Sequence, residues 1–152
     1  MDLAKDIAIV AASVIALGTL IVGVIEYFRQ GAAKRVEHFL EMRRRFKENQ
    51  KFKTITDLLL TDDEGLRDIP VGDKLDYLGF FEEIALSMNS RLINKNVAHY
   101  MFSYYAIRCW ESENFRRGIN CDSIYWQAFR DFVEQMKEIE QGFRFRRKNF
   151  QF

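Results

Sequence analysis

The chain has 152 residues, of which 48% are hydrophobic, 14% aromatic and 30% charged, and its formal net charge is +1. This composition excludes an intrinsically disordered chain, and two cysteines are too few for a disulfide-stabilised scaffold. The charges are unevenly distributed, because none lies between residues 7 and 25.

Residues 7–25 predict a membrane-spanning helix. A helix of this length is about 28 Å long, close to the ~30 Å hydrocarbon core of a bilayer. Ser13 and Thr19 are its only polar side chains, and both can return a hydrogen bond to the helix backbone. Tyr27 and Phe28 follow, where interfacial aromatic residues are expected. A cleaved signal peptide is the alternative, but the apolar stretch is too long and the residues before it are not net basic.

The flanking charges predict the orientation of this helix. Lys5 is the only basic residue before it, whereas six follow soon after: Arg29, Lys34, Arg35, Arg43, Arg44 and Arg45. The positive-inside rule therefore places the N-terminus outside and the rest of the chain in the cytoplasm. A cytoplasmic location also fits two cysteines that remain thiols.

Small residues form a stripe along the predicted membrane helix. They are Ala8, Ala12, Ala16, Thr19 and Gly23, at spacings of 4, 4, 3 and 4 residues. Small side chains let two helices approach closely in lipid, so one interpretation is self-association of the chain. The alternative is that such residues are simply frequent in membrane helices.

The remainder of the chain predicts helices and no strands, because apolar residues recur at helical spacing and nowhere alternate with period two. A helix is expected over residues 32–50, either as a straight continuation of the membrane helix or with a hinge at Gly31, and a short one over residues 52–59. Three further helices are expected to start at Asp73, at Asn94 or Asn96, and at Asp122 or Ser123, side chains suited to cap a helix N-terminus. Residues 61–72 and 114–120 are expected to be loops.

The expected fold class is therefore all-α, with one N-terminal transmembrane helix followed by a small cytoplasmic helical bundle. Residues 1–28 form the anchor, residues 29–141 the bundle and residues 142–152 a basic aromatic tail. The residues expected to face the core are Val36, Phe39, Leu40, Phe46, Phe52, Ile55, Leu58, Leu59, Leu75, Leu78, Phe81, Ile84, Ala85, Met88, Val97, Met101, Phe102, Ala106, Phe129, Phe132, Val133, Met136 and Ile139.

Charge is segregated within the predicted bundle. Residues 29–53 hold nine basic and three acidic residues, and residues 57–83 hold two basic and nine acidic ones. The basic block suits a surface near anionic headgroups, and the acidic block suits a solvated face. A further interpretation is that the basic block of one protomer faces the acidic block of a neighbour.

No catalytic or metal-binding motif is recognisable in the chain. The residues best suited to bind a transition metal, His38, His99, Cys109 and Cys121, lack the spacing of a zinc site. There is no glycine-rich phosphate loop and no nucleophile elbow. The sequence therefore predicts no catalytic residues, no metal and no cofactor.

Two clusters are candidate binding sites. Arg116 and Arg117 precede the last predicted helix, near Trp110 and Trp126, and could hold a phosphorylated or nucleotide ligand. The alternative is that the tryptophans are core residues and the arginines are solvated. The second cluster is the tail, where basic residues alternate with aromatic ones: Phe143, Arg144, Phe145, Arg146, Arg147 and Lys148. It suits a membrane surface or docking on its own domain better than single-stranded nucleic acid.

Three segments resemble a known family. They are YFRQGAAKRVEHFLEMRRRF, KLDYLGFFEEIALSMNSRLINKNVAHYMFSYYAIRCW and YWQAFRDFVEQM, and the resemblance lies in Leu78, Phe81, Glu82 or Glu83, Ile93 and Trp110. They are similar to the bacterial family catalogued as domain of unknown function 4760. The resemblance implies an all-helical domain on an inner-membrane anchor and supplies no catalytic residues.

Two function hypotheses follow. The first is a non-enzymatic bacterial inner-membrane protein that contacts the lipid bilayer, self-associates and binds a protein partner or a nucleotide signal through its cytoplasmic domain. By architectural analogy with small membrane proteins of phage defence, it could act as a membrane-perturbing effector. The alternative is a membrane-tethered enzyme acting on nucleic acid or a nucleotide.

Overall fold

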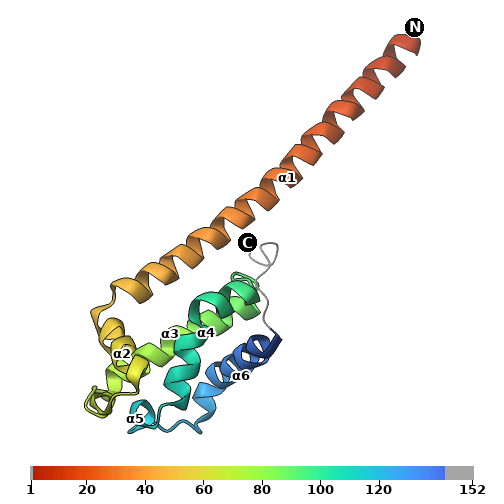
Figure 1. The fold of residues 1–152 in the computed structure, drawn as a ribbon. Helices are drawn as coiled ribbons and strands as arrows, with labels where there is room; N and C mark the ends of the chain where they lie inside the picture. The colour runs from red at the N-terminus through yellow and green to blue at the C-terminus, as the bar shows by residue number, and fades with distance from the viewer. Residues whose placement is uncertain (1, 143–152) are drawn as a thin grey trace. The chain divides into compact units, whose positions relative to one another are not determined.

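The structure is a computed structural model that describes residues 2–142, with side chains described from residue 5 onward. Its helices are α1 (Asp2–Glu48), α2 (Gln50–Thr61), α3 (Val71–Asn89), α4 (Lys95–Glu111), α5 (Glu113–Arg116) and α6 (Gln127–Gly142), with the 3-10 turns η1 (Glu64–Arg67) and η2 (Ile124–Trp126) (Figure 1). No strand occurs within these residues, and the all-α prediction is confirmed. The chain divides into two units, one ending at Glu37 and one beginning at His38.

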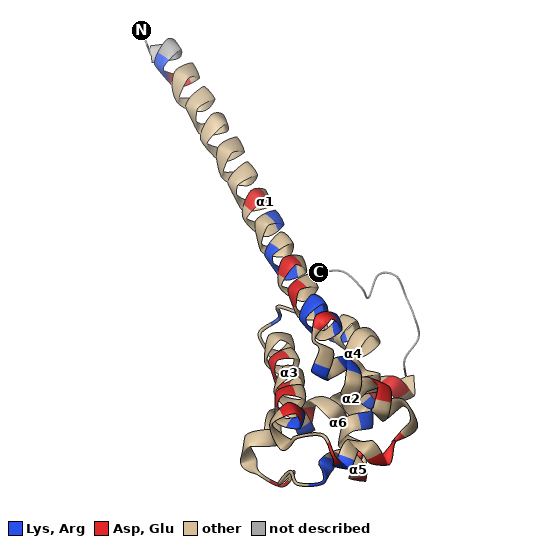
Figure 2. Ribbon diagram, turned by 90° about the vertical axis from the view of Figure 1, so that its left-hand side faces the viewer, with Lys and Arg blue, Asp and Glu red and all other residues tan. Residues whose placement is uncertain are grey.

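The first unit is the long apolar part of α1. By length and composition it could cross a membrane, and none of its most apolar stretch is buried. In Figure 2 this stretch is tan throughout, because it contains no Lys, Arg, Asp or Glu. The Ser13 and Thr19 hydroxyls donate to the carbonyl oxygens of Ile9 and Ile15 at 2.8 and 2.9 Å. Both polar side chains therefore bond to the backbone of their own helix, as expected.

Helix α1 runs through Gly31 without interruption, in agreement with the expected straight continuation of the membrane helix. The helix predicted to begin near residue 32 is the continuation of α1. A methyl group at Gly31 would meet only the end of the Arg35 side chain, at 3.5 Å. One glycine costs a helix only about 1 kcal/mol relative to alanine, too little to break a helix that extends on both sides.

The second unit is a helical bundle. Helices α3, α4 and α6 pack pairwise on one another, and α2 packs on α3 and α4 (Figure 1). The last turns of α1 belong to this unit and contribute Phe39 and Met42 to the core. Phe46 is half-buried and lies 5.2–6.1 Å, between ring centroids, from six other rings: Phe52, Tyr77, Phe80, Phe81, Phe102 and Tyr105.

The helix starts differ partly from expectation. Asn94, one of the two predicted alternatives, caps α4. Helix α3 begins earlier than predicted, after Pro70, whose missing N–H is no loss at a helix start. Asp73 lies instead in the first turn of α3, where it accepts a hydrogen bond from Lys51 Nζ at 2.6 Å.

The two predicted loops contain short helical turns. Residues 61–72 include η1, whose N-cap Asp63 accepts from Gly65 N at 2.7 Å. The predicted loop at 114–120 begins inside α5, which Ser112 caps by accepting from Phe115 N at 3.0 Å. Ser123, one of two predicted alternatives, caps η2, which leads directly into α6.

Two expected core positions are wrong, because Leu40 is 52% and Leu75 37% exposed. Lys74 is fully buried in place of its neighbour Leu75. Its ammonium lies 6.0 Å from the centre of the Phe115 ring and donates to the Arg117 carbonyl oxygen at 3.1 Å. A lysine can bury its stem when its charged end finds such a partner, which hydrophobic periodicity cannot indicate.

The buried lysine makes stability depend on pH. Burial lowers the pKa of Lys74 and the neighbouring charge of Arg117 lowers it further, so the unfolded chain binds this proton more tightly. The contribution of Lys74 to the free energy of unfolding therefore increases as pH rises from its lowered pKa to the ordinary value of 10.5. We expect the free energy of unfolding of wild type to increase relative to that of Lys74→Met as pH rises from 7.5 to about 10. Denaturant titration at several pH values measures this difference, and Lys95→Met, at an exposed lysine, is the control. A difference between Lys74→Met and wild type that does not change with pH would contradict the prediction.

Candidate functional site

The structure brings two of the four predicted anion-site residues together. Arg116 ends α5, and its guanidinium carbon lies 5.9 Å from the centre of the Trp110 ring. Its Nε is buried and has no hydrogen-bond partner among residues 5–142. Trp110 packs edge-on against Phe129 at 5.7 Å between ring centroids, and Trp126 also packs against the core. The tryptophans thus serve as packing residues, which was the alternative interpretation.

Arg117 is exposed and serves the fold through its backbone. Its carbonyl oxygen is the acceptor for the buried Lys74 ammonium. The η2 turn and its Ser123 cap separate both arginines from α6, so they do not directly precede that helix start. An anion site at Arg116 and Arg117 stays a prediction.

The predicted membrane-facing residues fall partly outside the described chain. All five residues of the small stripe are exposed, and Ala16, Thr19 and Gly23 line one shallow surface with Tyr27. Three of the five stripe residues therefore share one face of α1, and self-association through the stripe stays a prediction. The tail cluster at 143–148 lies outside the described residues.

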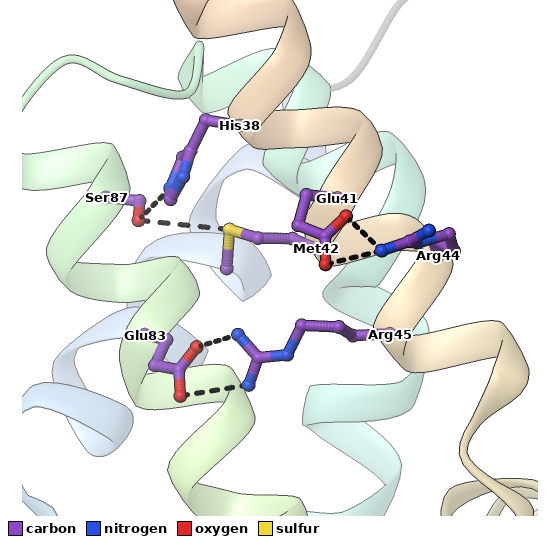
Figure 3. Close-up of polar contacts among 7 residues, drawn as sticks. All are labelled: His38, Glu41, Met42, Arg44, Arg45, Glu83 and Ser87. Atoms are coloured by element: carbon purple, nitrogen blue, oxygen red, sulfur yellow. Dashed lines mark hydrogen bonds and ion pairs between the residues drawn. The ribbon is translucent and has the colours of Figure 1, made fainter.

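The end of α1 is fixed to α3 by a polar seam (Figure 3). His38 Nε2 lies 3.0 Å from Ser87 Oγ, and Ser87 Oγ donates to the Met42 sulfur at 3.9 Å. Both polar side chains are thereby used in the packing of α1 on α3.

One turn further along, Arg45 and Glu83 extend the seam (Figure 3). The two guanidinium nitrogens donate to both carboxylate oxygens at 2.8 and 3.2 Å. Such a two-point pair fixes orientation more strongly than a single contact, although both side chains are half-exposed. Arg45–Glu83 and Lys51–Asp73 also join the basic block to the acidic block within one chain. These four groups are therefore not free for the proposed pairing between neighbouring protomers.

Sequence reasoning missed a pocket formed by α1, α2 and α4 within the second unit. The pocket has a volume of about 770 Å³. Arg43 and Lys47 line it from α1, and Lys53 lines it from α2. None of these three cations forms an ion pair with residues 5–142, and the Arg43 Nε is buried without a hydrogen-bond partner there. Asp57 is the single carboxylate in the lining.

The opposite wall of this pocket is aromatic and comes from α4. Tyr104 and Tyr105 pack edge-on at 5.5 Å between ring centroids. Tyr104 is 47% exposed and also lines a neighbouring pocket with Arg108, whose guanidinium lies 5.4 Å from its ring centre. The pocket thus combines three cations without an ion pair among residues 5–142 with tyrosine rings, and only the folded bundle brings these helices together.

No family model matches the chain, and neither a curated protein nor a solved structure matches it. Within the described residues, no group of three His, Cys, Asp or Glu side chains could hold a metal ion.

Proposed function

We propose that this chain is a non-enzymatic, single-pass membrane protein whose helical bundle binds a partner or signal. The observation that carries the proposal is the construction of α1. It is one uninterrupted helix that holds the apolar stretch and ends among the core residues of the bundle. Phe39 and Met42 from its last turns belong to that core, and Phe46 packs against it.

The flanking charges support an orientation with the bundle in the cytoplasm at a bacterial inner membrane. The small stripe supports self-association in lipid. The three segments that resemble the domain of unknown function 4760 family support membership of that family, and the architecture supports action as a membrane-perturbing defence effector.

The side chains that could serve as nucleophiles or bases are engaged in packing, which favours a binding role over an enzymatic one. In the seam between α1 and α3, Ser87 forms hydrogen bonds with His38 and with the Met42 sulfur. Cys109 is fully buried. Burial raises the pKa of the Cys109 thiol well above its ordinary value, which keeps it in the unreactive protonated form.

The test is an assay for turnover on the full chain in lipid nanodiscs. Incubation with single-stranded RNA and with nucleoside triphosphates should leave both substrates intact over hours, as followed by chromatography of the products. Cleavage that is absent from empty nanodiscs and lost in His38→Ala or Arg116→Gln would overturn the proposal and favour a membrane-tethered enzyme.

A further inference from the structure

We infer that the pocket between α1, α2 and α4 is a binding site for a nucleoside phosphate. The inference rests on the proposed binding function and names the class of its ligand. It differs from the predicted site at Arg116 and Arg117, because none of those residues lines this pocket.

The charge of the lining selects an anion. Arg43, Lys47 and Lys53 contribute three positive charges and Asp57 one negative charge, which leaves a net charge of +2. Other cations near them are already paired, because Arg44 binds Glu41 at 2.8 Å and Lys51 binds Asp73 at 2.6 Å. The three lining cations are thus the ones that remain available for phosphate oxygens, and the buried Arg43 Nε has an unused donor.

The aromatic wall selects a ligand that also carries a ring. A flat base can stack on a tyrosine ring of this lining, and the ring of Tyr104 is half-exposed. A volume of about 770 Å³ is within the usual range for small-molecule sites. An inorganic phosphate or a lipid headgroup would use the cations alone and leave the aromatic wall without a partner.

The chain's own basic tail is a poor occupant of the same pocket. Residues 143–152 contain four basic and no acidic residues, and their charge opposes that of Arg43, Lys47 and Lys53. A nucleoside phosphate has the complementary charge.

The test is a titration of the full chain in phosphatidylcholine nanodiscs with ATP, sodium triphosphate and adenosine, by calorimetry. ATP should bind more tightly than either fragment, since only ATP carries both recognised parts. Arg43→Gln and Lys53→Gln should each weaken ATP about tenfold, the usual value of a hydrogen bond to a charged group. Arg44→Gln removes the same charge one residue away, outside the lining, and should change ATP affinity by less than about twofold.

A second pair of variants tests the aromatic wall. Tyr104→Leu should weaken ATP and leave triphosphate unchanged, whereas Tyr125→Leu, at an exposed tyrosine outside the pocket, should change neither. Asp57→Asn should tighten ATP, because it removes the only negative charge of the lining. Melting curves show that each variant is folded.

The outcomes separate this inference from the proposed function. Absence of ATP binding, triphosphate binding as tight as that of ATP, or an equal loss in Arg44→Gln would each overturn the nucleoside phosphate site. A lower ATP affinity in nanodiscs that contain phosphatidylglycerol, with an ATP affinity of Arg43→Gln equal to that of wild type, would mean that the cations bind lipid headgroups. That result would also overturn the nucleoside phosphate site. None of these results affects membrane anchoring or the absence of turnover, whereas ATP hydrolysis would overturn the non-enzymatic function and leave the site in place.

Discussion

Replacing Phe46 with alanine should lower the free energy of unfolding of the bundle by about 2–3 kcal/mol, less than the ~3–5 kcal/mol of a fully buried aromatic side chain because Phe46 is half-buried. Phe46 comes from α1 and contacts rings of α2, α3 and α4. Its removal loses these ring contacts and enlarges the pocket that Phe46 lines, and movement of one helix cannot restore contacts to three others. Denaturant titration of the full chain in detergent measures the effect through Trp110 and Trp126, which both lie in the bundle.

The matched control for this prediction is Phe28→Ala, in the same helix. Phe28 is 68% exposed in its unit, so its removal should leave the denaturation midpoint of the bundle nearly unchanged. A loss below about 1 kcal/mol in Phe46→Ala would mean that the end of α1 is not part of the core.

Introducing two arginines into the apolar stretch should abolish membrane integration. Each arginine at the centre of a membrane helix costs about 2.5–3.5 kcal/mol on insertion scales, so Val14→Arg with Leu17→Arg costs roughly 5–7 kcal/mol. Both positions are more than half exposed, so the change removes no contact within the protein. Alkaline carbonate extraction of membranes should release the double variant into the supernatant and retain wild type in the pellet.

The control variant carries Val14→Leu and Leu17→Val, which keeps the stretch apolar and should stay in the pellet. Retention of the double arginine variant in carbonate-washed membranes would show that this stretch does not anchor the chain by crossing the bilayer.

Hydrophobic spacing predicted most of the helices because the bundle helices bury one face each. Val97, Phe102 and Ala106 of α4 are buried as expected. The prediction failed where a polar side chain replaced an apolar one in the core, as Lys74 does beside Leu75.

The pocket could not be found from sequence because its parts are distant in the chain. Arg43 and Lys53 are ten residues apart, and Tyr104 lies about fifty residues further on. Only the packing of α4 against α2 and the end of α1 brings them to one cavity. The predicted cluster of Arg116, Arg117, Trp110 and Trp126 relied on closeness in sequence. The structure brings only Arg116 and Trp110 together, and both tryptophans pack against the core.

The central claim is that α1 crosses a membrane and carries the bundle on its cytoplasmic side. Cysteine labelling tests it most directly, in a chain with Cys109→Ala and Cys121→Ser and one new cysteine at Asp6→Cys or Glu134→Cys. In intact spheroplasts, an impermeant maleimide should label the cysteine at position 6 and reach that at position 134 only after lysis. Labelling of both positions from the same side would contradict a membrane crossing, and the reverse pattern would contradict the orientation.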